Sequence, residues 1–201
     1  MSRLVTNAIR SVSASADAIT MDGSGNATFP NNVTCSGTAT GFGGGKLVNY
    51  AQTLKKDTAS VSSIAQGAVS GALISLNYTA ASTSNKLLLS YTCHIGIDTS
   101  VNTFGYLYIG GSVSTIIGDQ GLSSQKRATS TSQGTSSHEA MIHSFQTLIT
   151  TPATSSTTYG IHFGHANNGT HTIYINRDAG NTNDNYVARF ASSLTIMELE
   201  P

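Results

Sequence analysis

The chain has 201 residues, of which only 10% are charged, and its ten basic residues balance its ten acidic residues. That length fits one ordinary domain with an appendage. The balance of charge excludes a strongly basic surface for nucleic acid or an anionic membrane. No apolar run approaches the roughly 20 residues that cross a bilayer, and no apolar signal segment stands near Met1, so we expect neither membrane insertion nor a secretory leader.

Residues 1–16 are polar and contain one small apolar group, Leu4, Val5 and Ile9. We expect these side chains to form a short anchor. The next segment, residues 17–45, reads as a thin β-ribbon in which apolar residues alternate between the turn sequences DGSGN and PNN. It ends in the glycine run GFGGG, which predicts a flexible joint.

The ribbon has no obvious second layer of its own, and a ribbon of two or three strands is marginal in water. Three identical ribbons around a threefold axis can supply that layer, with Ile19, Met21, Phe29 and Val33 facing inward. Burying such side chains contributes about 1.5–3 kcal/mol each. The alternative is a hairpin that lies across the globular part of the same chain.

From residue 46 onward, strand signals follow one another, separated by Gly, Asn, Asp, Ser or Pro. We expect strands at 47–54, 72–79, 86–98, 104–111, 113–119, 138–150, 157–166, 171–177 and 192–200, with a polar loop from about Gly121 to Ser137. No segment predicts a convincing helix. The sequence therefore predicts an all-β protein: a short trimeric stem over 17–45, followed over 46–201 by an antiparallel sandwich of the jelly-roll kind.

Several patterns suggest chemistry and fail on spacing. The GFGGGK run lacks the Ser or Thr that a phosphate-binding loop requires after its lysine, and HEAMIH places its histidines five apart instead of four. His162 and His165 are three apart on a strand, which puts them on opposite faces. One of them could still meet its own copies on a threefold axis and hold a metal, although a simple hydrogen-bonded histidine is the expectation. We expect no catalytic site and no cofactor.

Three further groups are expected to be structural. Cys93 lies on the same face of its strand as its apolar neighbours, which predicts a buried, inert thiol. Glu198 and Glu200 share a strand face but are expected to form a solvated edge. Phe104, Tyr106 and Tyr108 form an aromatic stripe, for which core packing is expected in preference to a carbohydrate platform.

The stretch SADAITMDGSGNATFPNNVTCSGTATGFGGGK resembles the stem repeats of bacteriophage tail fibres and other virion appendages, especially from phages of cyanobacteria and marine bacteria. The later segments YGIHF, TIYINR and SSLTIMELE resemble the globular head that follows such stems, a trimeric jelly roll similar to the TNF-like kind. The resemblance implies a homotrimer in the virion, assembled in the host cytoplasm. Leu4, Val5 and Ile9 would then attach it to another virion protein of the baseplate, tail or capsid.

Two functions remain open under this resemblance. In the first, the head is the tip of a tail fibre and binds host surface polysaccharide through loops that contain Ser112–Thr115, Gly121–Ser137, Asn167–His171 and Asp178–Asn185. The residues expected to contact the receptor are Ser123, Gln125, Lys126, Arg127, Asn167, Asn168, Asp178 and Asn181. In the second, the protein is a capsid decoration, cement or head-fibre protein that binds no receptor.

Overall fold

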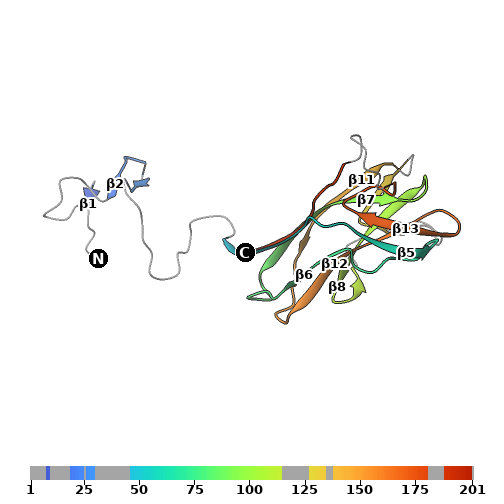
Figure 1. The fold of residues 1–201 in the computed structure, drawn as a ribbon. Helices are drawn as coiled ribbons and strands as arrows, with labels where there is room; N and C mark the ends of the chain where they lie inside the picture. Colours follow the sequence, from blue (N-terminus) through green and yellow to red (C-terminus); the bar gives the residue numbers. More distant parts are fainter. Residues whose placement is uncertain are drawn as a thin grey trace. The chain divides into compact units, whose positions relative to one another are not determined.

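The structure is a computed structural model that describes residues 8–9, 19–24, 26–29, 46–114, 127–134, 138–180 and 188–200. The chain forms two compact units, Met1–Gly43 and Gly44–Pro201, which we describe separately. Every regular element in the described residues is a β-strand (Figure 1). None of the described segments forms a helix that could cross a membrane.

The first unit contains a small antiparallel sheet of β1 (Ala8–Ile9), β2 (Ile19–Met21) and β3 (Ala27–Thr28), in that order. The predicted DGSGN turn joins β2 to β3. The carboxylate of Asp22 accepts hydrogen bonds from the backbone N–H groups of Ser24 and Asn26 at 2.9 and 2.8 Å. Asp22 thereby closes the turn in the way that this residue type favours.

The second unit contains two antiparallel sheets packed face to face. In the first sheet the order is β10-β8-β12-β6, and β9 also pairs with β8. Its strands are β6 (Ile74–Tyr78), β8 (Asn102–Ile109), β9 (Ser112–Val113), β10 (Ser130–Gln133) and β12 (Thr157–His165). The second sheet contains β4 (Leu47–Lys55), β5 (Ala59–Ala65), β7 (Lys86–Ile97), β11 (Ala140–Ile149), β13 (Thr170–Ile175) and β14 (Ser192–Leu199).

Strand β7 is the centre of the second sheet. One of its edges pairs with β11, and its other edge pairs first with β14 and then with β13. Beyond these, β4 pairs with β14 and β5 with β13. The sheet therefore reads β4-β14-β7-β11 at one end of the sandwich, which we call the Lys46 end. At the other end, which we call the Asp98 end, it reads β5-β13-β7-β11.

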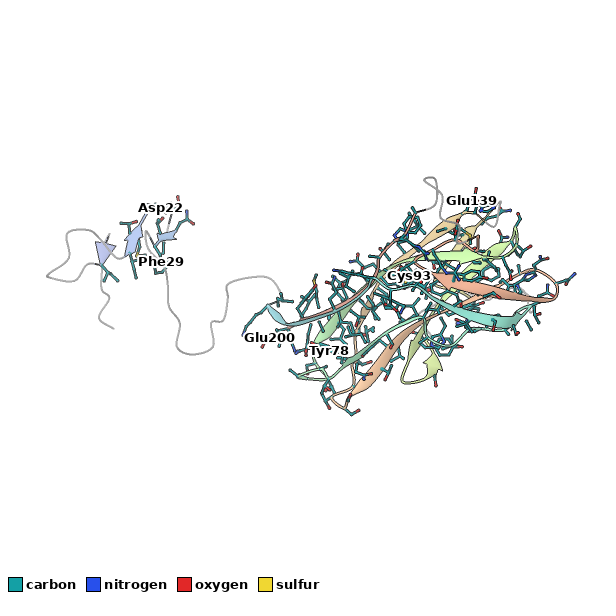
Figure 2. The ribbon with its side chains drawn as sticks, viewed as in Figure 1. Asp22, Phe29, Tyr78, Cys93, Glu139 and Glu200 are labelled. Carbon is teal, nitrogen blue, oxygen red and sulfur yellow. The ribbon has the colours of Figure 1, made fainter. Side chains whose placement is uncertain are left out.

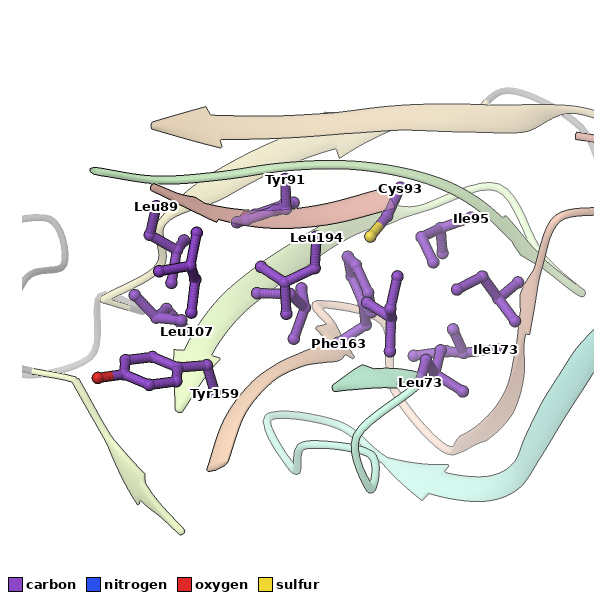
Figure 3. Packing of buried hydrophobic residues seen from close by; sticks show 14 of the residues in the cluster. Leu73, Leu89, Tyr91, Cys93, Ile95, Leu107, Tyr159, Phe163, Ile173 and Leu194 are labelled. Atoms are coloured by element: carbon purple, nitrogen blue, oxygen red, sulfur yellow. The ribbon is translucent and has the colours of Figure 1, made fainter. Parts of the chain in front are cut away.

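The core lies between the sheets and is built from strictly alternating strands. Along β7, Leu87, Leu89, Tyr91, Cys93 and Ile95 all point inward and are fully or almost fully buried. Figure 3 shows Leu89, Tyr91, Cys93 and Ile95 on one side of the core and Leu107, Tyr159 and Phe163 of the first sheet on the other. The predicted inward face of β7, with its buried thiol, is confirmed. The predicted all-β sandwich is confirmed at the level of two packed antiparallel sheets.

Most predicted strands are present within one or two residues of their expected bounds, including β11, whose periodicity is mixed. Two strands were missed, β5 and β10, and β10 lies inside the segment predicted as a loop. The strand predicted over 113–119 is present only as β9, because residues 115–126 lie outside the described part of the chain.

The prediction that Glu198 and Glu200 form a solvated sheet edge is wrong for Glu198. Strand β14 lies between β4 and β7, so it is an inner strand, and Glu198 is 0% exposed. Glu200 follows the register shift at the end of β14 and is exposed, 4.0 Å from the Lys46 ammonium. Figure 2 shows Glu200 and Tyr78 together at the Lys46 end.

The prediction that Phe104, Tyr106 and Tyr108 pack into the core is also wrong. On β8 the residues that point into the sandwich are Thr103, Gly105 and Leu107, of which Leu107 belongs to the core cluster. The aromatic stripe therefore lies on the outer face of the first sheet. Tyr106 is nevertheless buried on this outer face. It lies beside Gly164, and the Ala68 carbonyl lies close to the same glycine.

Candidate functional site

A row of apolar side chains crosses the outer face of the second sheet near the Lys46 end. Met197 of β14 pairs with Tyr50 of β4 and with Leu88 of β7, and Leu88 pairs with Leu148 of β11. Their neighbours in sequence point into the core, so these four point outward. We call Tyr50, Met197, Leu88 and Leu148 the apolar row. Its two outer members, Tyr50 and Leu148, are 49% and 41% exposed.

The next residues along the same face are polar. One row further on, Gln52, Thr195, Ser90 and Gln146 are aligned, and Gln52 donates from Nε2 to the Thr195 hydroxyl at 3.0 Å. Leu47 adds a further exposed apolar side chain beside the row. The sheet thus presents an apolar stripe with neutral polar groups on one side and Lys86, opposite Leu199, on the other, and an apolar centre with a polar rim is the composition of a contact surface between proteins.

The first unit also exposes apolar side chains. Ile9 is exposed, and Met21 and Phe29 are each 44% exposed, while Ile19 is only half-buried. Figure 2 shows Phe29 beside the small sheet. Among the described residues of this unit, these side chains find no apolar core. The other residues predicted for the stem and the anchor, Val33, Leu4 and Val5, lie outside the described residues.

The predicted receptor residues are distributed over different parts of the second unit. Asn167 and Asn168 lie at the Asp98 end, in the turn between β12 and β13. There His171 contacts the Asp98 carboxylate at 2.8 Å and the Asn168 carbonyl at 3.1 Å, which ties this turn to the end of β7. Asn167 donates to the Thr99 hydroxyl at 3.4 Å.

The remaining receptor predictions do not join this turn. Arg127 is exposed and precedes β10, which pairs with the outer edge of β8. Asp178 is only 3% exposed, so its carboxylate is not presented to a ligand at the surface. It packs against Gly96 on β7, with the His138 ring at 4.0 Å. Ser123, Gln125, Lys126 and Asn181 lie outside the described residues.

A hollow opens on the outer face of the first sheet, where the exposed edge of the aromatic stripe meets β12. It has a volume of about 410 Å³. The Tyr108 ring stacks on the His162 ring, with centroids 3.9 Å apart and planes inclined by 26°. The lining residues are Ala72, Tyr108, Gly110, Gly111, Ser156, Thr157, Thr158, Gly160 and His162. Neither Tyr108 nor His162 was predicted as a binding residue.

A second hollow of about 310 Å³ lies nearby, between the β8–β9 hairpin and the segment that joins β11 to β12. Its walls include Ile109, Val113, Ile149 and Pro152, with Tyr159 at its inner end. It is more apolar than the hollow at Tyr108 and lacks an aromatic ring exposed at its rim.

Between the sheets, His143 sits in a network of hydroxyl groups. Its Nε2 contacts the Thr103 hydroxyl at 2.8 Å and its Nδ1 contacts the Ser130 hydroxyl at 2.9 Å. The Tyr91 hydroxyl joins the network through Ser130 and Thr129. Burial lowers the pKa of His143 to about 4, so the ring is neutral at neutral pH. The Ser130–His143 contact resembles an activated nucleophile, but the ring is 1% exposed and a substrate has no access to it.

The paired carboxylates do not form an acid–base site either. Glu198 accepts hydrogen bonds from the Tyr78 hydroxyl, the Asn85 amide and the backbone N–H of Ala81 at 2.7, 2.6 and 2.8 Å. Burial alone would raise its pKa, but these donors outweigh burial and lower it. A buried carboxylate held ionised by three donors is a structural anchor.

The described residues contain no group of three or more His, Cys, Asp and Glu side chains arranged to hold a metal. His165 is fully buried and its Nε2 contacts the Ile64 carbonyl at 2.7 Å, so it does not face a surface where copies could meet. His162 lies on the opposite, outer face, as its spacing from His165 predicted.

No protein-family model matches the chain, and the comparison with curated proteins found no match.

The geometry leaves two kinds of candidate surface in the described residues: apolar faces suited to self-association, and the polar hollow at Tyr108.

Proposed function

We propose that the protein is a homotrimeric appendage of a bacteriophage virion, with a short stem and a jelly-roll head that binds glycans on the host surface. The observation that carries the proposal is the apolar surface left exposed by both units of the single chain. In the first unit it is Met21 and Phe29, and in the second it is the apolar row. Sister copies are the partner that can cover both surfaces at once.

The strand order supports the finer assignment of the head. Apart from β5, β9 and β13, eight strands form two sets of four, ordered β4-β14-β7-β11 in one sheet and β6-β12-β8-β10 in the other, and the chain changes sheet at every step except from β8 to β10. Eight strands exchanged in this way between two sheets are the arrangement of a jelly roll. The resemblance of the stem and head segments to phage appendages supports the same assignment.

The stem proposal rests on the turn that Asp22 closes and on the apolar side chains around it. A sheet of such short strands is not stable alone. Three copies would bury Ile19, Met21 and Phe29 against one another and give the ribbon its missing layer. We include Val33 in the proposed trimer contact because, in the sequence, it continues the alternation of apolar residues along the ribbon.

Low charge suits a trimer whose copies meet on an axis, because stacked like charges would repel. The apolar row and the polar row beside it contain no Asp, Glu, Lys or Arg, and the one charged side chain among the residues paired on the other side is Lys86, opposite Leu199. The receptor-binding role uses surfaces away from this row, and three equivalent sites would raise a weak affinity for each glycan by avidity.

The alternative role is capsid decoration. In that role the exposed Ile9 on β1 would bind a capsid protein instead of a tail component. In both roles Leu4, Val5 and Ile9 would make the attachment.

Gold-labelled antibody against the purified chain tests the proposal on intact particles. A fibre is expected to be labelled at the tail or its fibres, and purified protein should bind host cells. Labelling over the whole capsid, with no binding to cells, would instead support the decoration role. Particles that carry no label at any position would contradict both.

A further inference from the structure

The hollow at Tyr108 has the properties of a small-ligand site. Its volume of about 410 Å³ falls within the roughly 300–1,000 Å³ that is usual for such sites. It opens on the face of the sandwich opposite the apolar row, so self-association through that row leaves it accessible. Its walls come from β8 and β12, from the chain before β6 at Ala72, and from the β8–β9 turn.

Glycines keep the hollow open. Gly160 lies opposite Tyr108 on the neighbouring strand, and a Cβ there would stand 3.3 Å from the Ala72 Cβ and 3.1 Å from the His162 Nε2. Gly110 and Gly111, at φ +61° and +84°, form the two-residue turn between β8 and β9. These positive φ values suit glycine, and they expose backbone instead of side chains at the rim.

The aromatic wall is held in place by the backbone. His162 Nδ1 contacts the Ser70 carbonyl at 2.7 Å, and a carbonyl only accepts, so Nδ1 carries the proton. Burial lowers the pKa of His162, which keeps the ring neutral and leaves Nε2 as an acceptor. The Tyr108 ring rests on this fixed imidazole and is half-exposed.

The chemistry of the walls selects the ligand. No charged side chain is among the lining residues of the hollow, which disfavours phosphates, sulfates and acidic sugars. The Ser156 hydroxyl can donate and accept. The Thr157 and Thr158 hydroxyls donate to the Ser155 carbonyl and to Asn77 Oδ1, so their oxygens, like His162 Nε2, can accept from a ligand hydroxyl. An aromatic face attracts polarised C–H groups. A ligand with one C–H-rich face and hydroxyls around its rim fits all three features.

We propose that this hollow binds a neutral hexopyranose unit, with the C–H face of the sugar against Tyr108 and a sugar hydroxyl donating to His162 Nε2. The inference rests on the proposed function, since it names the sugar class and the binding site of the glycan-binding head. It moves the site from the residues predicted to contact the receptor to the outer face of β8 and β12.

Saturation-transfer NMR on the full-length protein tests this, with the methyl glycosides of glucose, galactose, mannose and N-acetylglucosamine as separate probes. At least one probe is expected to receive saturation on the protons of one ring face. Tyr108→Ala should weaken that binding by about tenfold or more, while Tyr108→Phe should keep it within about threefold, because the ring makes the contact. His162→Ala should also weaken it.

Phe104→Ala is the matched control, since Phe104 lies on the same strand and face but outside the hollow. It should bind the glycoside as the unmodified protein does, and thermal melting would show that every variant is folded. The inference is overturned if no glycoside receives saturation, or if Tyr108→Ala binds as well as the unmodified protein.

Binding to host cells separates this inference from the proposed function. Cell binding that is unchanged in a folded Tyr108→Ala protein would refute the hollow as the receptor site and leave the glycan-binding head standing. Glycoside binding that depends on Tyr108, in a protein that ignores host cells and virions, would refute the proposed function and leave the site standing.

Discussion

At the scale of single residues, the stability of the sandwich depends on a few buried polar groups with complete sets of partners. Glu198 is the clearest, because its carboxylate accepts hydrogen bonds from Tyr78 at the end of β6 and from Ala81 and Asn85 in the segment after it. It fastens the two sheets to each other at the Lys46 end. Its partner Tyr78 has its pKa raised by burial and by the hydrogen bond to Glu198, so the phenol stays a donor.

Glu198→Gln should destabilise the protein by about 2–3 kcal/mol, because the amide places an N–H₂ group against donors and leaves at least one buried donor unpaired. Urea unfolding at pH 7 measures the loss. Glu200→Gln is the matched control just after the end of β14 and should change the free energy of unfolding by less than about 0.5 kcal/mol. Equal stability of the two variants would contradict the anchoring role.

Glu198 also makes stability depend on pH in the acidic range. Its pKa is lower in the folded protein than the ordinary 4.5, so the unfolded chain takes up a proton more readily. Its contribution is complete above pH 4.5 and is lost as the pH falls through the folded pKa. The difference in unfolding free energy between the unmodified protein and Glu198→Gln should therefore shrink below pH 4.5.

His143 makes the free energy of unfolding depend on pH over a higher pH range than Glu198 does. Its pKa of about 4 lies below the ordinary 6.5, because burial penalises the charged ring. Its neutral form contributes fully above pH 6.5, and the contribution falls by roughly 3 kcal/mol between pH 6.5 and 4, at about 1.4 kcal/mol per pKa unit. His143→Gln should lack this slope in urea unfolding measured across that range. Parallel slopes in the two proteins would contradict the assignment.

Cys93 should be inert in the folded protein. Burial raises the pKa of its thiol to about 12, and the side chain is 0% exposed. In a Cys35→Ser background, an aromatic disulfide reagent at pH 8 is expected to label Cys93 only after urea is added. Rapid labelling without denaturant would show that the core opens locally at β7.

At the scale of elements, a strand could be predicted from sequence where large apolar residues occupy alternate positions. The strands that lack this alternation, β5 and β10, could not be predicted. Strand β7 alternates over its whole length. Strand β5 was missed because Val61 and Ile64 are three apart. The structure explains this spacing: Ser63 has φ +58°, and the pairing of β5 with β13 shifts register at that point, so both residues can face inward.

Strand β10 was missed for a different reason. Its inward residues are Ser130 and Ser132, which have no apolar signal at all. Polar groups in the core accommodate them, since the Ser130 hydroxyl contacts the His143 ring and Thr103 donates to the backbone carbonyl of Ser132. For the same reason the faces of β8 were misjudged, since Gly105 and Thr103 point inward while tyrosines point outward. Nothing in the local sequence reports these distant partners.

The apolar row gives the element-scale test of self-association. Leu148→Lys places an ammonium in the row and should weaken the trimer by more than about tenfold, since burying that charge is costly. Ile142→Lys is the matched control, because Ile142 lies on the same outward face of β11, away from the row, beside His94. Sedimentation velocity over a concentration series measures both. If Leu148→Lys and Ile142→Lys dissociated the trimer equally, a trimer contact centred on the apolar row would be contradicted.

At the scale of the whole molecule, sequence predicted an all-β chain with a thin leading ribbon and a sandwich. It also identified the apolar residues of the ribbon that the structure leaves exposed. It did not locate the hollow at Tyr108. The walls of this hollow come from β8, β12 and the chain at Ala72, which are distant in sequence, and they include glycines and the stacked rings of Tyr108 and His162. The alternation of Tyr106 and Tyr108 was visible, but which face they occupy depends on the polar core behind them.

The central claim is that both units complete their apolar contacts with two further copies of the chain. Sedimentation equilibrium of the purified full-length protein tests this most directly. The account predicts a single species with the mass of three chains, in which Met21 and Phe29 are protected from oxidation and surface labelling. A stable species with the mass of one chain and the same two residues protected would contradict it, because the ribbon would then be packed against its own polypeptide.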